Sequence, residues 1–99
     1  MAQTQSDTIT KTELTYPNRY NVVFINDDFT PMDFVVQLLV EVFNRTLEEA
    51  KDITVTIQDK GKGVAGSYNF ELAEQKKAES VAISRNNGHP LTILVEKIE

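Results

Sequence analysis

Three helix-start signals divide the chain and constrain its fold more than any other feature. Thr30 stands directly before Pro31, and this pair is typical of an N-cap followed by the first residue of a helix. Thr46 is followed three residues later by Glu49, which is the spacing of a capping box. Asn69, a third residue of the N-cap type, precedes a segment with apolar residues at helical spacing. The sequence therefore predicts three helices.

The first of these helices should be the central one. Asp33 stands at the third helical position, where it can complete a capping box with Thr30. Phe29 and Phe34 occupy the two positions of a hydrophobic staple around that cap. The helix should run from about Pro31 to Phe43. Because it is apolar nearly all round, we expect it to be buried among the other elements.

Short β-branched and aromatic runs lie around the helices and predict strands. The middle run contains two glycines, so we expect it to be bent or bulged, and Gly88 should end the third helix as its C′ residue. The expected strands are residues 19–25, 62–70 and 91–98, the second and third helices are residues 46–57 and 70–86, and residues 59–63 form a turn. The order β-α-α-β-α-β, with helices that can cover one face of a small sheet, predicts an α+β fold.

The composition describes one small domain. With 99 residues, no cysteine and 40% hydrophobic residues, the chain can form a modest core without a disulfide or a thiolate metal site. Residues 1–18 are rich in Thr, Gln and Ser, so we expect a flexible tail before a domain at 19–99. The net charge of −5 argues against nucleic acid as a partner. The sequence has no pattern of a membrane span or signal peptide, and we expect a cytoplasmic protein.

Asn26, Asp27 and Asp28 lie between the first strand and the first helix. One interpretation is turn chemistry, because such side chains bond to the backbone of their own turn. A metal site with Asp27, Asp28 and Asp33 as ligands is a weaker interpretation, because the spacing fits no EF-hand loop. A third is amine binding: amide and carboxylate oxygens accept hydrogen bonds from an ammonium group, and Met32 offers an adaptable apolar wall. That combination suits the first residue of a polypeptide.

The remaining polar motifs do not predict catalysis. His89 stands before Pro90, and no Ser or Cys nucleophile motif accompanies it. The stretch DKGKGVAG lacks the spacing and the trailing Lys-Ser/Thr of a phosphate-binding P-loop. We therefore expect no enzymatic activity, no cofactor and no metal site.

Four short motifs occur in order along the chain: NDDFTPMDFV, GKGVAG, FELAEQK and GHPL. Together they resemble the ClpS adaptors, which carry N-degron substrates to the AAA+ unfoldase of the Clp protease. The resemblance covers about residues 19–97. It implies a three-stranded antiparallel sheet packed against three helices, and an adaptor that recognises N-terminal residues.

The resemblance also implies roles for individual residues. Asn26 and Asp27 would hold the α-amino group of the substrate's first residue, with Asp28 close by. Gln58 stands where the family commonly has a His beside that group, and its amide oxygen can still accept a hydrogen bond. Met32 corresponds to a gatekeeper that excludes β-branched residues. The implied pocket for the first side chain is formed by Thr30, Met32, Val35, Ile57 and Leu91.

Partners follow from the same resemblance. Glu71 and Lys76 match positions that contact the N-terminal domain of the Clp unfoldase, and residues 1–18 match in role an extension used in delivery. The substrates would be N-degron polypeptides that start with Leu, Phe, Tyr or Trp, bound by a monomer. The alternative is a protein-interaction domain of the same fold without N-terminal-residue recognition, as in the C-terminal domain of the ribosomal stalk protein.

Overall fold

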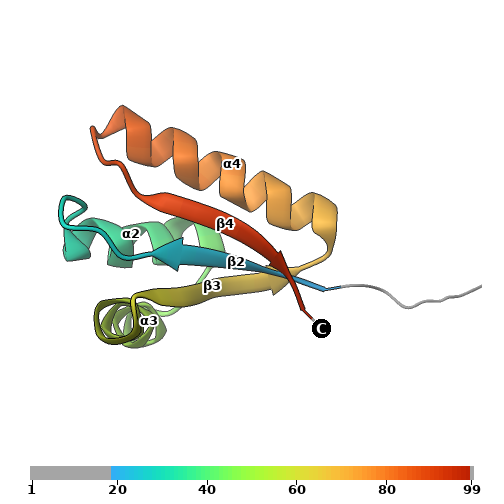
Figure 1. Cartoon of the computed structure of the whole chain (residues 1–99), viewed down its shortest axis with the longest axis horizontal. Coiled ribbons are helices and arrows are strands. Elements are labelled where there is room, and N and C mark those ends of the chain that lie inside the picture. Colours follow the sequence, from blue (N-terminus) through green and yellow to red (C-terminus); the bar gives the residue numbers. More distant parts are fainter. Residues whose placement is uncertain (1–18, 99) are drawn as a thin grey trace, which may run out of the picture.

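The computed structural model describes residues 19–98 and confirms the α+β fold in the predicted order (Figure 1). The elements are β2 (Tyr20–Ile25), α2 (Met32–Phe43), α3 (Leu47–Lys60), β3 (Lys62–Tyr68), α4 (Phe70–Asn86) and β4 (Thr92–Lys97). The expected tail at 1–18 lies outside the described residues. Between residues 19 and 98, no helix combines the length and the apolar character that crossing a membrane requires.

The three strands form one antiparallel sheet with β2 in the middle, in the order β3-β2-β4. Ile25, the last residue of β2, pairs with Lys62 at the start of β3 and with Thr92 at the start of β4. The register between β2 and β3 shifts between Val22 and Val23, so the bulge expected in the glycine-containing strand is present. As a result, the end of β2 and the beginnings of β3 and β4 meet at one end of the sheet.

The helices enclose the core against the sheet. Helix α3 contacts β3, α4 contacts β4, and α2 contacts both other helices, which confirms its predicted central position. On β2, Val22 and Phe24 point into the core because alternate residues of a strand share a face. The buried core consists of Val22, Phe24, Val35, Leu38, Leu39, Val42, Phe43, Ala50, Ile57, Ala65, Ala73, Leu91 and Ile93.

The predicted start of α2 is wrong in its details. Pro31, in an extended conformation, is the N-cap, and no side chain caps the helix. The hydroxyl of Thr30 donates to Asp27 instead, and Asp33 accepts a hydrogen bond from the backbone of Phe34. The expected staple is also absent, because Phe29 is 78% exposed. The physical reason is that the Asp27 carboxylate accepts charge-assisted hydrogen bonds from both the N–H and the hydroxyl of Thr30, which holds this residue to the preceding loop.

The other two helix starts are as predicted. Thr46 and Glu49 form a complete capping box, with N···O distances of 3.0 and 3.1 Å. Asn69 accepts a hydrogen bond from the backbone of Leu72. Helix α3 extends to Lys60 and ends at Gly61, whose φ is 88°, so the turn is shorter than the predicted 59–63. Gly88, with φ of 75°, follows the end of α4 as expected.

Candidate functional site

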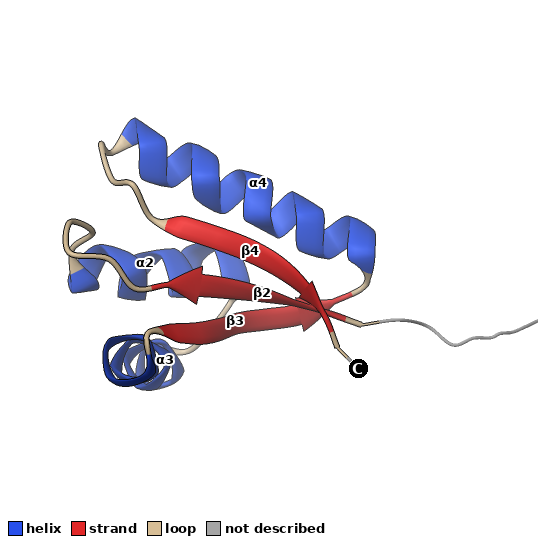
Figure 2. Cartoon of the chain, viewed as in Figure 1, coloured by secondary structure: helices blue, strands red, loops and turns tan. Residues whose placement is uncertain are grey.

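The residues predicted to bind the substrate lie in or beside three connections that meet at one end of the sheet (Figure 2). These are the loop from β2 to α2, the turn from α3 to β3, and the loop from α4 to β4. The backbone N–H of Asn26 donates to the carbonyl of Gly61 over 2.9 Å, which ties the first connection to the second. Residues far apart in the sequence therefore lie together here.

Asp27 organises the loop before α2. One carboxylate oxygen accepts the backbone N–H groups of Phe29 and Thr30, each at 2.7 Å, and the other accepts the Thr30 hydroxyl at 2.9 Å. Burial raises the pKa of the Asp27 carboxyl, but these hydrogen bonds outweigh it and hold the pKa below the ordinary value. The charge of His89 lowers the same pKa further. The turn-chemistry interpretation thus describes part of what Asp27 does.

Asn26 and Gln58 are the two amide side chains of the predicted site. Both are exposed, and within residues 19–98 neither side chain has a hydrogen-bond partner. Gln58 directly follows Ile57, whose carbonyl accepts the N–H of Gly61, the residue that also binds Asn26. Asp28 is exposed beside them. Two amide groups and a partly buried carboxylate therefore face the solvent at the same end of the sheet.

The predicted pocket residues lie at the same end of the sheet and are mostly buried. Val35, Ile57 and Leu91 are buried in the core, and Met32 packs against it while half-buried. Thr30 is 5% exposed and is held by Asp27. Leu91 immediately precedes β4, at the position that faces the end of β2 in the sheet register. The structure therefore brings all five residues to one end of the molecule.

Two residues at this end of the molecule were not among the predicted site residues. Thr54 is buried, and its hydroxyl donates to the Ala50 carbonyl. Thr54 shares a helix face with Ile57 because the two are one turn apart. The second residue is His89, whose ring packs edge-on against Phe34 with ring centroids 4.5 Å apart. No sequence signal connects these two aromatic side chains.

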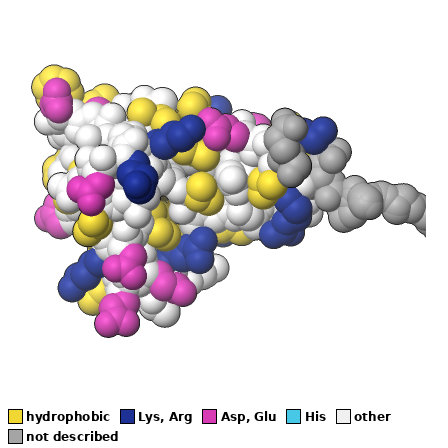
Figure 3. Space-filling model, turned by 60° about the horizontal axis from the view of Figure 1, so that its bottom comes forward, with side chains coloured by type: hydrophobic (Ala, Val, Ile, Leu, Met, Phe, Trp, Pro, Cys, Tyr) yellow, Lys and Arg dark blue, Asp and Glu magenta, His cyan; other side chains and the backbone are white. Residues whose placement is uncertain are grey.

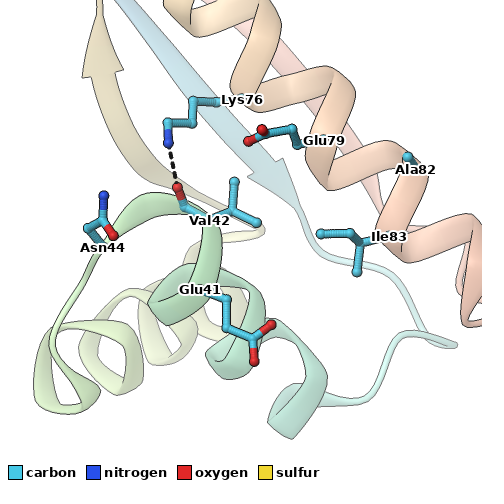
Figure 4. A pocket seen from close by; sticks show the side chains of 7 residues that line it. All are labelled: Glu41, Val42, Asn44, Lys76, Glu79, Ala82 and Ile83. Carbon is cyan, nitrogen blue, oxygen red and sulfur yellow. Dashed lines mark hydrogen bonds between the residues drawn. The ribbon is translucent and has the colours of Figure 1, made fainter.

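Glu71 and Lys76 lie on α4, away from this end of the sheet. Glu71 is exposed in the first turn, which lies toward the opposite end of the molecule (Figure 1). The Lys76 ammonium donates to the Val42 carbonyl over 2.7 Å, in the last turn of α2 where carbonyls lack helical partners. It lies in an open groove of about 530 Å³ (Figure 4). The groove is lined by Glu41, Val42, Asn44, Lys76, Glu79, Ala82 and Ile83.

Comparison with known proteins decides the family. A family model described as ATP-dependent Clp protease adaptor protein ClpS matches residues 15–94. The chain belongs to the ClpS family of Clp protease adaptors. An ATP-dependent Clp protease adapter protein ClpS of Helicobacter hepaticus is 41% identical over 99% of both chains. A ClpS of Xanthomonas oryzae pv. oryzae is 46% identical over 88% of this chain and 82% of the relative.

A solved ClpS structure has the same fold. Agrobacterium tumefaciens ClpS2 bound to L-phenylalaninamide superimposes with a TM-score of 0.80 and 29% sequence identity. The match covers 84% of this chain and all of that one. The predicted three-stranded antiparallel sheet with three helices is therefore the fold of ClpS. The family assignment made from the four sequence motifs is confirmed.

Proposed function

We propose that this protein is an adaptor that binds the free α-amino group and the bulky first side chain of N-degron substrates. The single observation that supports this most is the arrangement at one end of the sheet. There, Asn26 and Gln58 have exposed amides without partners in residues 19–98, and Ile57, which precedes Gln58, belongs to the buried apolar core. The ligand named for ClpS2 fits such a site, because L-phenylalaninamide has an amino group next to an apolar ring.

The amino group would be held by three side chains. An ammonium group has three donors, and Asn26, Asp27 and Gln58 can each supply an acceptor oxygen. A carboxylate has about four acceptor positions, and three of those of Asp27 are used within its own loop. One position is left for a ligand. Asp28 would add negative charge nearby without a direct bond.

The first side chain would enter between Thr30, Met32, Val35, Ile57 and Leu91. Leu, Phe, Tyr and Trp would be accepted because they are apolar and unbranched at Cβ. Met32 is half-buried and flexible, so it can form an adaptable wall at the mouth of the pocket. A substrate branched at Cβ would collide with it.

Delivery would use a different part of the molecule. The exposed Glu71 and the free donors of Lys76 would contact the N-terminal domain of a Clp AAA+ unfoldase, and residues 1–18 would act in the transfer. The adaptor would work as a cytoplasmic monomer without a cofactor or catalytic activity of its own. On the face shown in Figure 3, Lys and Arg side chains alternate with Asp and Glu, which suits protein partners better than a phosphate backbone.

A titration with matched peptides tests the proposal. A peptide that starts with Leu should bind, and the same peptide with an acetylated N-terminus should bind at least about tenfold more weakly, because acceptors that the bound peptide covers then lack their partner. A control peptide that starts with Ser should also bind weakly. Equal affinity for the free and acetylated forms would instead indicate an interaction domain that does not read N-terminal residues.

Deletion of residues 1–17 separates binding from delivery. The truncated protein should bind the Leu peptide with unchanged affinity but fail to support degradation by the unfoldase and protease. Normal degradation with the truncated adaptor would contradict the assigned role of this segment.

A further inference from the structure

His89 is the only histidine of the chain and lies between α4 and β4, outside the set of residues proposed to touch the ligand. Both the backbone N–H and the backbone carbonyl of His89 form hydrogen bonds. The N–H donates to the Ser84 carbonyl over 2.9 Å, and the carbonyl accepts from the Arg85 guanidinium over 2.9 Å. Its half-buried ring packs against Phe34 at an interplanar angle of 62°. The loop therefore presents this ring to α2 in a defined orientation.

The contact joins two segments that carry proposed pocket residues. Phe34 lies in the first turn of α2, between Met32 and Val35. On the other side, Leu91 is two residues after His89, and the same Arg85 guanidinium donates to its carbonyl over 3.1 Å. Edge-to-face aromatic contacts add attraction beyond the area that they bury. Loss of the ring would thus let the start of α2 move relative to Leu91.

We propose that His89 is a positioning residue of the N-terminal-residue site: its ring holds the first turn of α2 against the segment before β4, so that Met32 and Val35 keep their place relative to Leu91. This inference rests on the proposed function.

Two substitutions test the role of the ring. His89→Ala removes it, whereas His89→Phe keeps an aromatic ring that can pack against Phe34. Phe70→Ala is the matched control, because Phe70 makes a similar contact with Tyr20, with ring centroids 5.1 Å apart, near the opposite end of the sheet. Calorimetry with a Leu-starting peptide at pH 7.5 measures the affinity of the wild type and the three variants.

The expected results distinguish His89→Ala from the other two variants. His89→Ala should lose about tenfold in affinity at pH 7.5, and Phe70→Ala should bind like the wild type. His89→Phe should also bind like the wild type, because its ring can make the same edge-on contact with Phe34. Amide exchange at Phe29 and Thr30, measured without ligand, should be faster in His89→Ala only.

Three outcomes would overturn the inference. Wild-type affinity in His89→Ala would show that the ring does not position the site. A loss in His89→Phe as large as that in His89→Ala would show that an aromatic ring at this position does not hold it. Either result leaves the proposed function intact, because the wild type still binds. Failure of the wild type to bind the peptide would overturn the proposed function together with this inference.

Discussion

Helices α2 and α3 both follow a threonine that has an acidic residue three positions later, but only α3 begins in a capping box. At α3, the Thr46 hydroxyl oxygen accepts the N–H of Glu49, and the Glu49 carboxylate accepts the N–H of Thr46. At α2, the Thr30 hydroxyl turns away from the helix and donates to Asp27. The residue three positions before each threonine explains the difference. Asp27 stands before Thr30 and accepts its hydroxyl, whereas Phe43, which stands before Thr46, has no acceptor in its side chain.

The loop before α2 lacks the side-chain cap that stabilises the start of α3. A missing N-cap costs about 1 kcal/mol, so α2 starts less favourably than α3 does. In return, one carboxylate fixes the loop through three hydrogen bonds and leaves Asn26 exposed beside the turn at Gly61. Departures from a local rule are expected where a functional site has its own demands. The four predictions below test whether this loop serves binding while the α3 start serves stability alone.

Substitution of Asp27 should have the largest effect. Asp27→Ala removes the loop's three hydrogen bonds and the negative charge proposed to face the substrate amine. Affinity for a Leu-starting peptide should fall about 100-fold, because hydrogen bonds to charged groups contribute roughly 1.5–3 kcal/mol each. Calorimetry at pH 7.5 measures this loss.

The adjacent carboxylate provides the control. Asp28→Ala removes the same charge from an exposed position whose side chain makes no hydrogen bond within residues 19–98. It should reduce affinity by about threefold or less, as expected for a nearby charge in solvent. Equal losses in the two variants would mean that the loop contributes only general negative charge.

Met32, the first residue of α2, should control which side chains enter the pocket. Met32→Ala should raise the affinity ratio of Ile-starting to Leu-starting peptides about tenfold, because a steric barrier to a branched Cβ is removed. The measurement is a pair of titrations on each protein. An unchanged ratio would indicate that Met32 is an ordinary core residue that does not select the ligand.

The range of each interaction explains which features could be predicted from the sequence. Thr46 with Glu49 and Asn69 with Leu72 interact three residues apart, so the starts of α3 and α4 could be read correctly. The start of α2 could not be predicted correctly. The capping rule compares Thr30 with the residues that follow it and does not consider Asp27, an acceptor three residues earlier.

The candidate site depends on contacts of longer range. Asn26 and the Gly61 turn meet only because β2 and β3 pair, and no spacing in the sequence specifies this. The role of Gln58 could therefore be inferred only from the resemblance to a known family. The contact of His89 with Phe34 joins α2 to a loop near the end of the chain, and neither source predicted it.

The two threonines should separate stability from binding. Thr46→Ala should lower the free energy of unfolding by about 1 kcal/mol and leave peptide affinity unchanged. Thr30→Val keeps the buried volume but removes the donor to Asp27, so it should lower stability by a similar amount and affinity about threefold. Urea denaturation and calorimetry on both variants make the comparison. A loss of affinity in Thr46→Ala would show that the two helix starts are coupled.

The smallest expected effect is the acid dependence of stability that Asp27 contributes. Its pKa is held below the ordinary value of 3.8 because hydrogen bonds to the ionised carboxylate outweigh burial. Folding therefore favours the ionised form, and the resulting stability is fully present above pH 3.8 and is lost as the pH falls through the lowered pKa. Asp27→Asn keeps an acceptor oxygen for the backbone but has no charge to lose. It should be less stable than the wild type at pH 6, and the two free energies of unfolding should converge as the pH falls from 3.8 through the lowered pKa of Asp27. Asp28→Asn controls for the change in net charge. A difference between the wild type and Asp27→Asn that stays constant from pH 6 to pH 2.5 would show that the charge of Asp27 does not hold the loop.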